Sequence, residues 1–173
     1  MRYTARMQKR VHHDDLASEA EALLARLARG ERATVVALSG DLGAGKTTFT
    51  QHVARALGVE EVVVSPTFVI QKVYALPREI PRLRDSLRSN NVLGAESRAA
   101  GQSFDRLVHV DAYRLEGAHE LKKLGWAELL ADPGNLILIE WPERVSEALP
   151  PGTLYVTLDT LDEFVRSFSY EIN

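Results

Sequence analysis

One glycine-rich segment constrains the fold of this chain more than any other feature of its sequence. Residues 40–47 read GDLGAGKT and match the pattern G-x-x-x-x-G-K-[ST]. The apolar, β-branched run at 33–38 before this segment predicts a buried strand, and Phe49, Val53 and Leu57 after it repeat at helical spacing. A strand, a glycine loop and a helix in this order predict an α/β domain with a phosphate-binding loop.

The loop has the groups that bind the phosphates of a nucleotide. Glycines let successive backbone N–H groups turn toward phosphate oxygens, and the start of the next helix adds partial positive charge. In this pattern Lys46 reaches the β- and γ-phosphates, and the Thr47 hydroxyl ligates magnesium. ATP is expected rather than GTP, since the sequence has no N-K-x-D-like motif. We therefore expect an ATPase with ATP and Mg²⁺ as cofactors, whose nucleotide-binding residues are Asp41, Leu42, Gly43, Ala44, Gly45, Lys46, Thr47 and Thr48.

Two other predicted strands end in a carboxylate. Residues 107–110 lead into Asp111, and the apolar run 136–139 leads into Glu140. Ligands of open α/β sheets bind at the carboxyl ends of the strands, so we expect both carboxylates near the glycine loop. One of them would orient Mg²⁺ and the other would position the attacking water, and the pattern leaves open which does which.

The remaining patterns complete a single P-loop ATPase domain over residues 1–173. Apolar residues from Leu16 to Leu27 predict a helix that is capped by Asp14 or Asp15 and stopped by Gly30. Further elements are expected at 68–74 (strand), 116–130 (helix with a break near Gly125), 154–159 and 164–172 (hairpin). The expected fold is α/β, a three-layer P-loop NTPase-like domain. Its mixed sheet has a parallel core of 33–38 and 136–140, an antiparallel pair of 68–74 with 107–110, and a C-terminal antiparallel hairpin.

Composition narrows the possible partners and compartments. The net charge of −3 gives the whole chain no attraction to nucleic acid or acidic membranes, and the absence of cysteine excludes disulfides and cysteine-ligated zinc. No apolar run approaches the roughly 20 residues that span a bilayer, and the first residues lack the apolar stretch of a signal peptide. We expect a cytoplasmic protein with no membrane partner.

The segment 77–105 differs from its surroundings. It is rich in arginine, proline, glycine, serine and asparagine and has few large apolar residues. We expect an inserted excursion from the domain that is flexible or partly helical. Two interpretations stay open: a basic flap that touches nucleic acid or a protein partner, and a solvated loop.

Five motifs in chain order closely resemble the bacterial TsaE (YjeE) family, the ATPase component of the machinery that makes threonylcarbamoyladenosine in tRNA. The resemblance covers about residues 12 to 159. The motifs are GDLGAGKTT at 40–48, SPTF at 65–68, HVDAYRL at 109–115, EL at 120–121 with Gly125, and EWPER at 140–144.

The resemblance implies further roles. Thr67 would sense the γ-phosphate and the metal from a switch-like loop, and Asp111 would be needed for hydrolysis. Glu140 would be a Walker B-like magnesium ligand, with Trp141 packing near the nucleotide. Family members act with TsaB and TsaD, and with tRNA indirectly through that complex. Their slow ATP turnover resets the complex for the modification of A37. The segment 77–105 departs from the family, which joins these strands by a short link.

A small-molecule kinase is the main alternative. In that case the γ-phosphoryl group passes to a bound alcohol, and the arginine-rich segment 77–105 acts as a lid that excludes water. The chain has no recognisable acceptor-binding motif beside Asp111, which favours the ATPase. A nucleotide-gated binding module, whose weak ATPase times an assembly, is compatible with the favoured interpretation.

Overall fold

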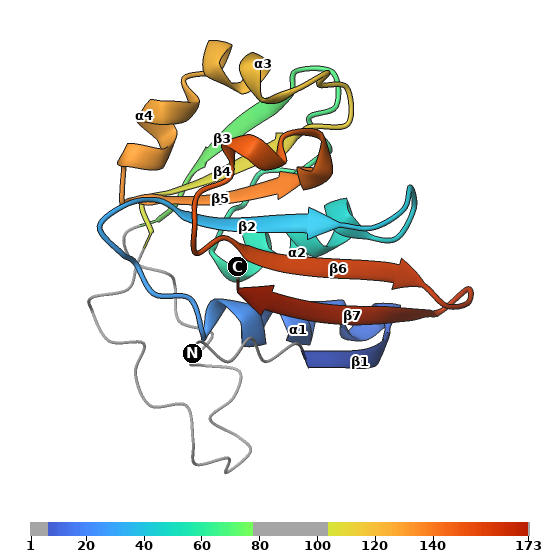
Figure 1. The fold of residues 1–173 in the computed structure, drawn as a ribbon. Helices are drawn as coiled ribbons and strands as arrows, with labels where there is room; N and C mark the ends of the chain where they lie inside the picture. Colours follow the sequence, from blue (N-terminus) through green and yellow to red (C-terminus); the bar gives the residue numbers. More distant parts are fainter. Residues whose placement is uncertain (1–6, 78–103, 173) are drawn as a thin grey trace, which may run out of the picture.

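The structure, a computed structural model, describes residues 7–77 and 104–172. Its seven strands form one sheet in the order β1-β7-β6-β2-β5-β4-β3 (Figure 1). The strands are β1 (Met7–His12), β2 (Thr34–Ser39), β3 (Gln71–Ala75), β4 (Arg106–Asp111), β5 (Asn135–Glu140), β6 (Leu154–Thr160) and β7 (Val165–Ile172). The α-helices are α1 (Leu16–Leu24), α2 (Lys46–Ala56), α3 (Ala118–Lys123) and α4 (Trp126–Ala131), and short 3₁₀ turns lie at His13–Asp15, Pro142–Arg144 and Ser146–Ala148.

The pairing of the strands confirms the predicted parallel core. β2 runs parallel to β5 on one side and to β6 on the other, and β4 runs parallel to β5. The predicted antiparallel pairs are also present, since β3 pairs with β4 and β6 pairs with β7. β2 therefore lies in the middle of the sheet, and its carboxyl end delivers the glycine loop between the ends of neighbouring strands.

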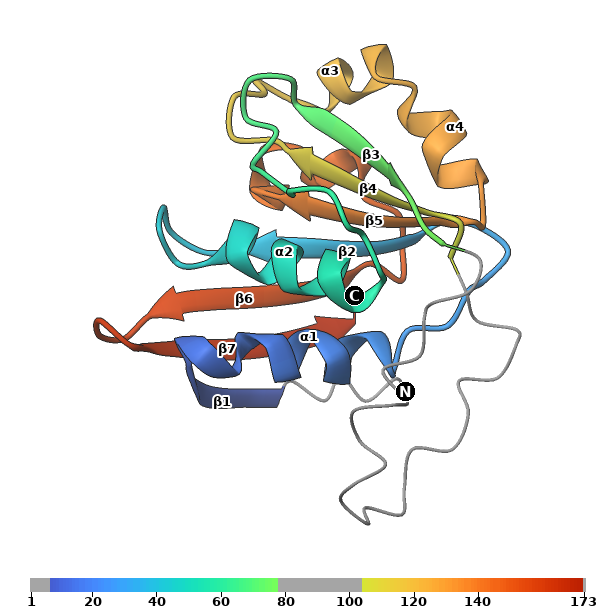
Figure 2. The same ribbon diagram turned by 180° about the vertical axis from the view of Figure 1, so that it is seen from behind.

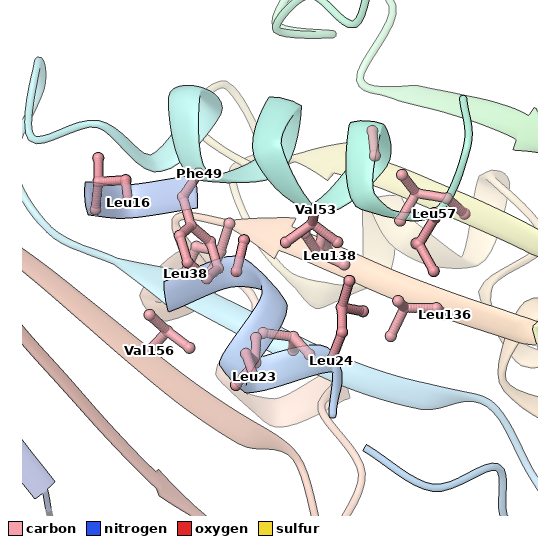
Figure 3. Packing of buried hydrophobic residues seen from close by; sticks show 14 of the residues in the cluster. Leu16, Leu23, Leu24, Leu38, Phe49, Val53, Leu57, Leu136, Leu138 and Val156 are labelled. Atoms are coloured by element: carbon pink, nitrogen blue, oxygen red, sulfur yellow. The ribbon is translucent and has the colours of Figure 1, made fainter. Parts of the chain in front are cut away.

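Helices cover both faces of this sheet. Alternate residues of a strand point to opposite faces, and Val36 and Leu38 of β2 pack in a different core cluster from Val35 and Ala37. α1 and α2 cover the first face and lie in front of the sheet in Figure 2, where Phe49 and Val53 of α2 point at the strands (Figure 3). α3 and α4 cover the second face through Leu121, Trp126 and Leu130. Because side chains alternate between the two faces, every second residue of β4 and β5 faces the side of the sheet that α2 covers.

The predicted helices form, with two corrections. α1 buries its predicted apolar residues but ends at Leu24, well before Gly30. Asp15 precedes α1 without making a side-chain cap, and it is His12 whose ring accepts from a backbone N–H at the start of the 3₁₀ turn. The predicted break near Gly125 is confirmed, because this glycine separates α3 from α4 with a left-handed φ of 71°.

Two strand predictions were wrong or missing. Phe68 to Ile70 form a turn rather than the start of a strand, because the N–H groups of Val69 and Ile70 bond to the Pro66 carbonyl. β1 was not predicted, since it is a polar edge strand in which Val11 is the buried apolar residue. Pairing with β7, rather than its own pattern, makes it a strand.

The segment 77–105 lies almost wholly outside the described residues, so the predictions for it stay predictions. In the part of the chain that is described, no helix is long and apolar enough to cross a membrane.

Candidate functional site

The glycine loop connects the end of β2 to the start of α2 and passes close to the backbone of β6. A Cβ on Gly40 would lie 2.0 Å from the Leu158 carbonyl oxygen of β6, so only glycine fits there. Gly43 has a left-handed φ of 81°, and the N–H of Ala44 bonds back to the Asp41 carbonyl at 3.1 Å. The loop then enters α2, whose first residue is Lys46. The N-terminus of this helix supplies free N–H groups and partial positive charge.

A cavity of about 390 Å³ opens in front of this helix. Most of the predicted nucleotide-binding residues line it, whereas Asp41 is exposed and Ala44 is fully buried, and neither is among the lining residues. Two larger hollows, of about 710 and 870 Å³, lie at the other end of β2 and beside α4, and neither contains the loop. The lining residues are Leu42, Gly43, Gly45, Lys46, Thr47, Thr48, Ser65, Thr67, Asp111, Tyr113, Glu140 and Trp141.

Glu140 lies directly opposite the first turn of α2. The Thr47 hydroxyl donates to its carboxylate, at 2.9 Å from Oε1 and 3.1 Å from Oε2. The Nε2 atom of His109 lies 2.8 Å from Oε1, and the Glu140 side chain is almost wholly buried. A hydroxyl and a carboxylate that share a cavity wall are the oxygen ligands that Mg²⁺ prefers.

Asp111 is the neighbour of Glu140 across the sheet, because the two residues are paired in the register of β4 and β5. Its Oδ2 atom accepts from the Ser65 hydroxyl at 2.7 Å and from the Thr67 hydroxyl. Its Oδ1 atom accepts from the Tyr113 N–H at 3.0 Å. The carboxylate therefore ties the predicted switch-like loop to the end of the sheet.

Lys46 is buried at the centre of the site. Its Nζ atom donates to the carbonyls of Gly40 at 2.6 Å and Asp41 at 2.9 Å, and it lies 3.8 Å from the centre of the Trp141 ring. Burial lowers the pKa of Lys46, and the nearby carboxylates, Glu140 foremost, act against that shift. A partly desolvated ammonium group is stabilised by any anion that enters the cavity.

Two aromatic rings form another wall of the cavity. The rings of Tyr113 and Trp141 are tilted against each other with centroids 5.0 Å apart. Trp141 has an unusual left-handed backbone, with φ of 59°, which turns the chain directly after the strand that carries Glu140. Trp141 lines the cavity, and its packing near a nucleotide stays a prediction.

Sequence reasoning did not assign roles to three residues of this site. Ser65 and Tyr113 belong to recognised motifs, but their bonds to Asp111 depend on how the loop folds back onto the sheet. The sequence spacing could have placed His109 near the site, because residues two apart on a strand share a face. It therefore lies on the same face of β4 as Asp111.

Comparison with known protein families gives a clear match. The family model described as threonylcarbamoyl adenosine biosynthesis protein TsaE matches residues 12–85 and 95–168. Residues 86–94, between the two matched stretches, lie inside the segment predicted as an insertion.

Curated relatives named tRNA threonylcarbamoyladenosine biosynthesis protein TsaE are also similar to this chain. The protein from Streptomyces coelicolor is 39% identical over 136 residues, which cover 78% of this chain and 74% of the relative. The protein from Rickettsia felis is 34% identical over 140 residues, which cover 80% of this chain and 66% of the relative. The protein from Bacillus subtilis is 33% identical over 136 residues, covering 79% of this chain and 68% of the relative.

A solved structure has the same fold. The crystal structure of YdiB from Bacillus subtilis superposes with a TM-score of 0.65 at 24% sequence identity, covering 99% of this chain and 88% of that chain.

Proposed function

Because this chain belongs to the TsaE family, we propose that it binds ATP with Mg²⁺ in the cavity at the end of β2 and hydrolyses it slowly. The observation that carries this proposal is the meeting of three groups at one helix start: the glycine loop, the buried Lys46 ammonium, and the Thr47 hydroxyl bonded to Glu140. This arrangement supports a P-loop NTPase-like site. The activity serves the formation of N6-threonylcarbamoyladenosine at A37 of tRNA.

The residues around α2 would bind the triphosphate. The N–H groups of the loop and of the first helical turn would donate to phosphate oxygens. Lys46 would exchange its bonds to the loop carbonyls for bonds to the β- and γ-phosphates, which removes the penalty of its burial. Thr47 uses its proton in the bond to Glu140, so its lone pairs stay available to a metal. Bound Mg²⁺ would neutralise charge on the phosphate oxygens.

Asp111 and Thr67 would act on the other side of the γ-phosphate. Asp111 is an acceptor next to Glu140, where it can hold the attacking water in line with the phosphate. The Thr67 hydroxyl, now bonded to Asp111, would turn to the γ-phosphate or the metal. Oδ2 of Asp111 would then keep its bond to Ser65 and have one acceptor position open for that water. The same loop thereby senses the nucleotide.

The partner in this proposal is the TsaB–TsaD heterodimer, with tRNA reached indirectly through the complex. Support comes from two exposed apolar side chains: Leu42, which lines the cavity and is 81% exposed, and Phe68, which follows the lining residue Thr67 and is 86% exposed. Exposed apolar side chains that gather around a site favour a protein contact. Phe68 directly follows Thr67, so a partner on this surface would sense the loop. A cytoplasmic location stays a prediction.

The proposal is tested by measuring phosphate release from ATP and Mg²⁺ by the isolated chain, with and without a TsaB–TsaD pair. We expect slow release without any acceptor, a faster rate with the pair, and a preference for ATP over GTP. Lys46→Ala should abolish nucleotide binding or turnover, because no other ammonium group lines the cavity among the described residues. Transfer of label from γ-labelled ATP to a metabolite would establish a kinase and refute the ATPase.

A further inference from the structure

His109 is a fully buried polar side chain that the proposed chemistry does not use. It lies on β4 with none of its surface exposed, and it is not among the residues that line the cavity. Leu107, two residues earlier on the same face of β4, belongs to the apolar core under α1 and α2. A buried polar group at such a position lowers stability unless its hydrogen bonds are made.

The ring of His109 makes one hydrogen bond within the described part of the chain. Its Nε2 atom lies 2.8 Å from Oε1 of Glu140, and an ionised carboxylate can only accept, so the proton of this bond lies on Nε2. The other ring nitrogen, Nδ1, is buried and has no partner among the described residues. An apolar side chain at this position would avoid the unpaired nitrogen, but it could not donate to Glu140. The bond to Glu140 is therefore what histidine provides here and an apolar residue does not.

We infer that His109 is a positioning residue that fixes the orientation of the Glu140 carboxylate for the bound metal. Oε1 is held from inside the sheet by His109, and Thr47 donates to the carboxylate from the first turn of α2. The two donors come from different elements, so together they prevent the carboxylate from rotating. Partners that orient a metal ligand in this way typically change metal affinity about 10–100-fold when they are removed.

This inference rests on the proposed function, and its test compares ADP binding with Mg²⁺ and with EDTA by isothermal titration calorimetry. ADP avoids turnover, and the ratio of the two dissociation constants measures the coupling between metal and nucleotide. The variants are His109→Leu, which removes the donor, and His109→Gln, whose amide nitrogen is as many bonds from Cβ as Nε2. His109→Asn is polar but one bond too short, and it replaces the leucine variant if that one does not fold.

For His109→Leu or His109→Asn we expect the Mg²⁺-dependent gain in ADP affinity to fall about 10-fold or more, with affinity in EDTA nearly unchanged. His109→Gln should keep most of the gain. Thermal unfolding of each variant checks the fold. The inference is overturned if the gain is unchanged in a folded variant without the donor, or if affinity falls equally in both buffers. A wild-type chain that binds no ADP in either buffer would refute the proposed function and this inference with it.

Discussion

Replacing Gly40 with alanine tests whether the glycine loop is built against β6 as the structure describes. The added Cβ would lie 2.0 Å from the Leu158 carbonyl oxygen, whereas such atoms essentially never approach within 3.0 Å. The loop and β6 would have to separate by at least 1.0 Å, the difference of these two distances. Leu158 is fully buried and paired with Phe168 of β7, so this shift would disturb the core.

The expected loss of stability follows from two contributions. The backbone of Gly40 has φ of 135°, which is unfavourable for alanine and costs roughly 1–3 kcal/mol. Forcing a methyl group against a packed strand costs roughly another 1–3 kcal/mol. We therefore expect Gly40→Ala to lose about 2–6 kcal/mol, a large part of the stability of an ordinary domain.

Gly43→Ala is the matched control, because it tests the backbone alone. Gly43 also has a left-handed φ, of 81°, but a Cβ there would meet no atom within 4 Å. Its cost should be about 1–2 kcal/mol. Urea unfolding followed by circular dichroism measures both variants. Equal losses in the two variants, or a Gly40→Ala protein within about 1 kcal/mol of wild type, would show that the described approach of loop and strand is wrong.

Two further predictions concern carboxylates. Asp111→Ala should leave the ATP dissociation constant within about 3-fold of wild type and lower the hydrolysis rate about 100-fold or more. The reason is that the positioning of water matters only in the transition state. Equal losses in binding and turnover would show that the role of Asp111 is wrongly assigned. Asp162, in the β6–β7 turn, accepts from two backbone N–H groups, and these bonds lower its pKa below the ordinary value of 3.8. Its charge thus adds stability above that value, and the contribution is lost as the pH falls through the lowered pKa. By urea unfolding, wild type should be more stable than Asp162→Asn at neutral pH, and this difference should shrink as the pH falls below 3.8; a constant difference would exclude this linkage.

Local patterns in the sequence predicted the frame of the site because each pattern is set by neighbouring residues. The β-branched run before the glycine loop and the helical spacing after it were enough to predict β2 and α2. Asp111 and Glu140 were expected near the loop because both end buried strands, and the register of β4 and β5 brings them side by side. These predictions needed only the geometry of parallel sheets.

Other features depend on contacts between distant parts of the chain, which no local pattern contains. β1 is a strand because its backbone pairs with the edge of β7, although its own residues are mostly polar. The run from Phe68 to Ile70 has the residue types of a strand, yet bonds to Pro66 hold it in a turn beside Asp111.

The sequence by itself determined that this chain has a phosphate-binding loop between a buried strand and a helix, and that two carboxylates each end a buried strand. Only the tertiary structure decided which groups hold those carboxylates: Ser65 and Thr67 on Asp111, and Thr47 and His109 on Glu140. The reason is physical. A hydrogen bond between residues 31 to 93 positions apart depends on how strands and helices pack, and no spacing along the chain encodes that arrangement.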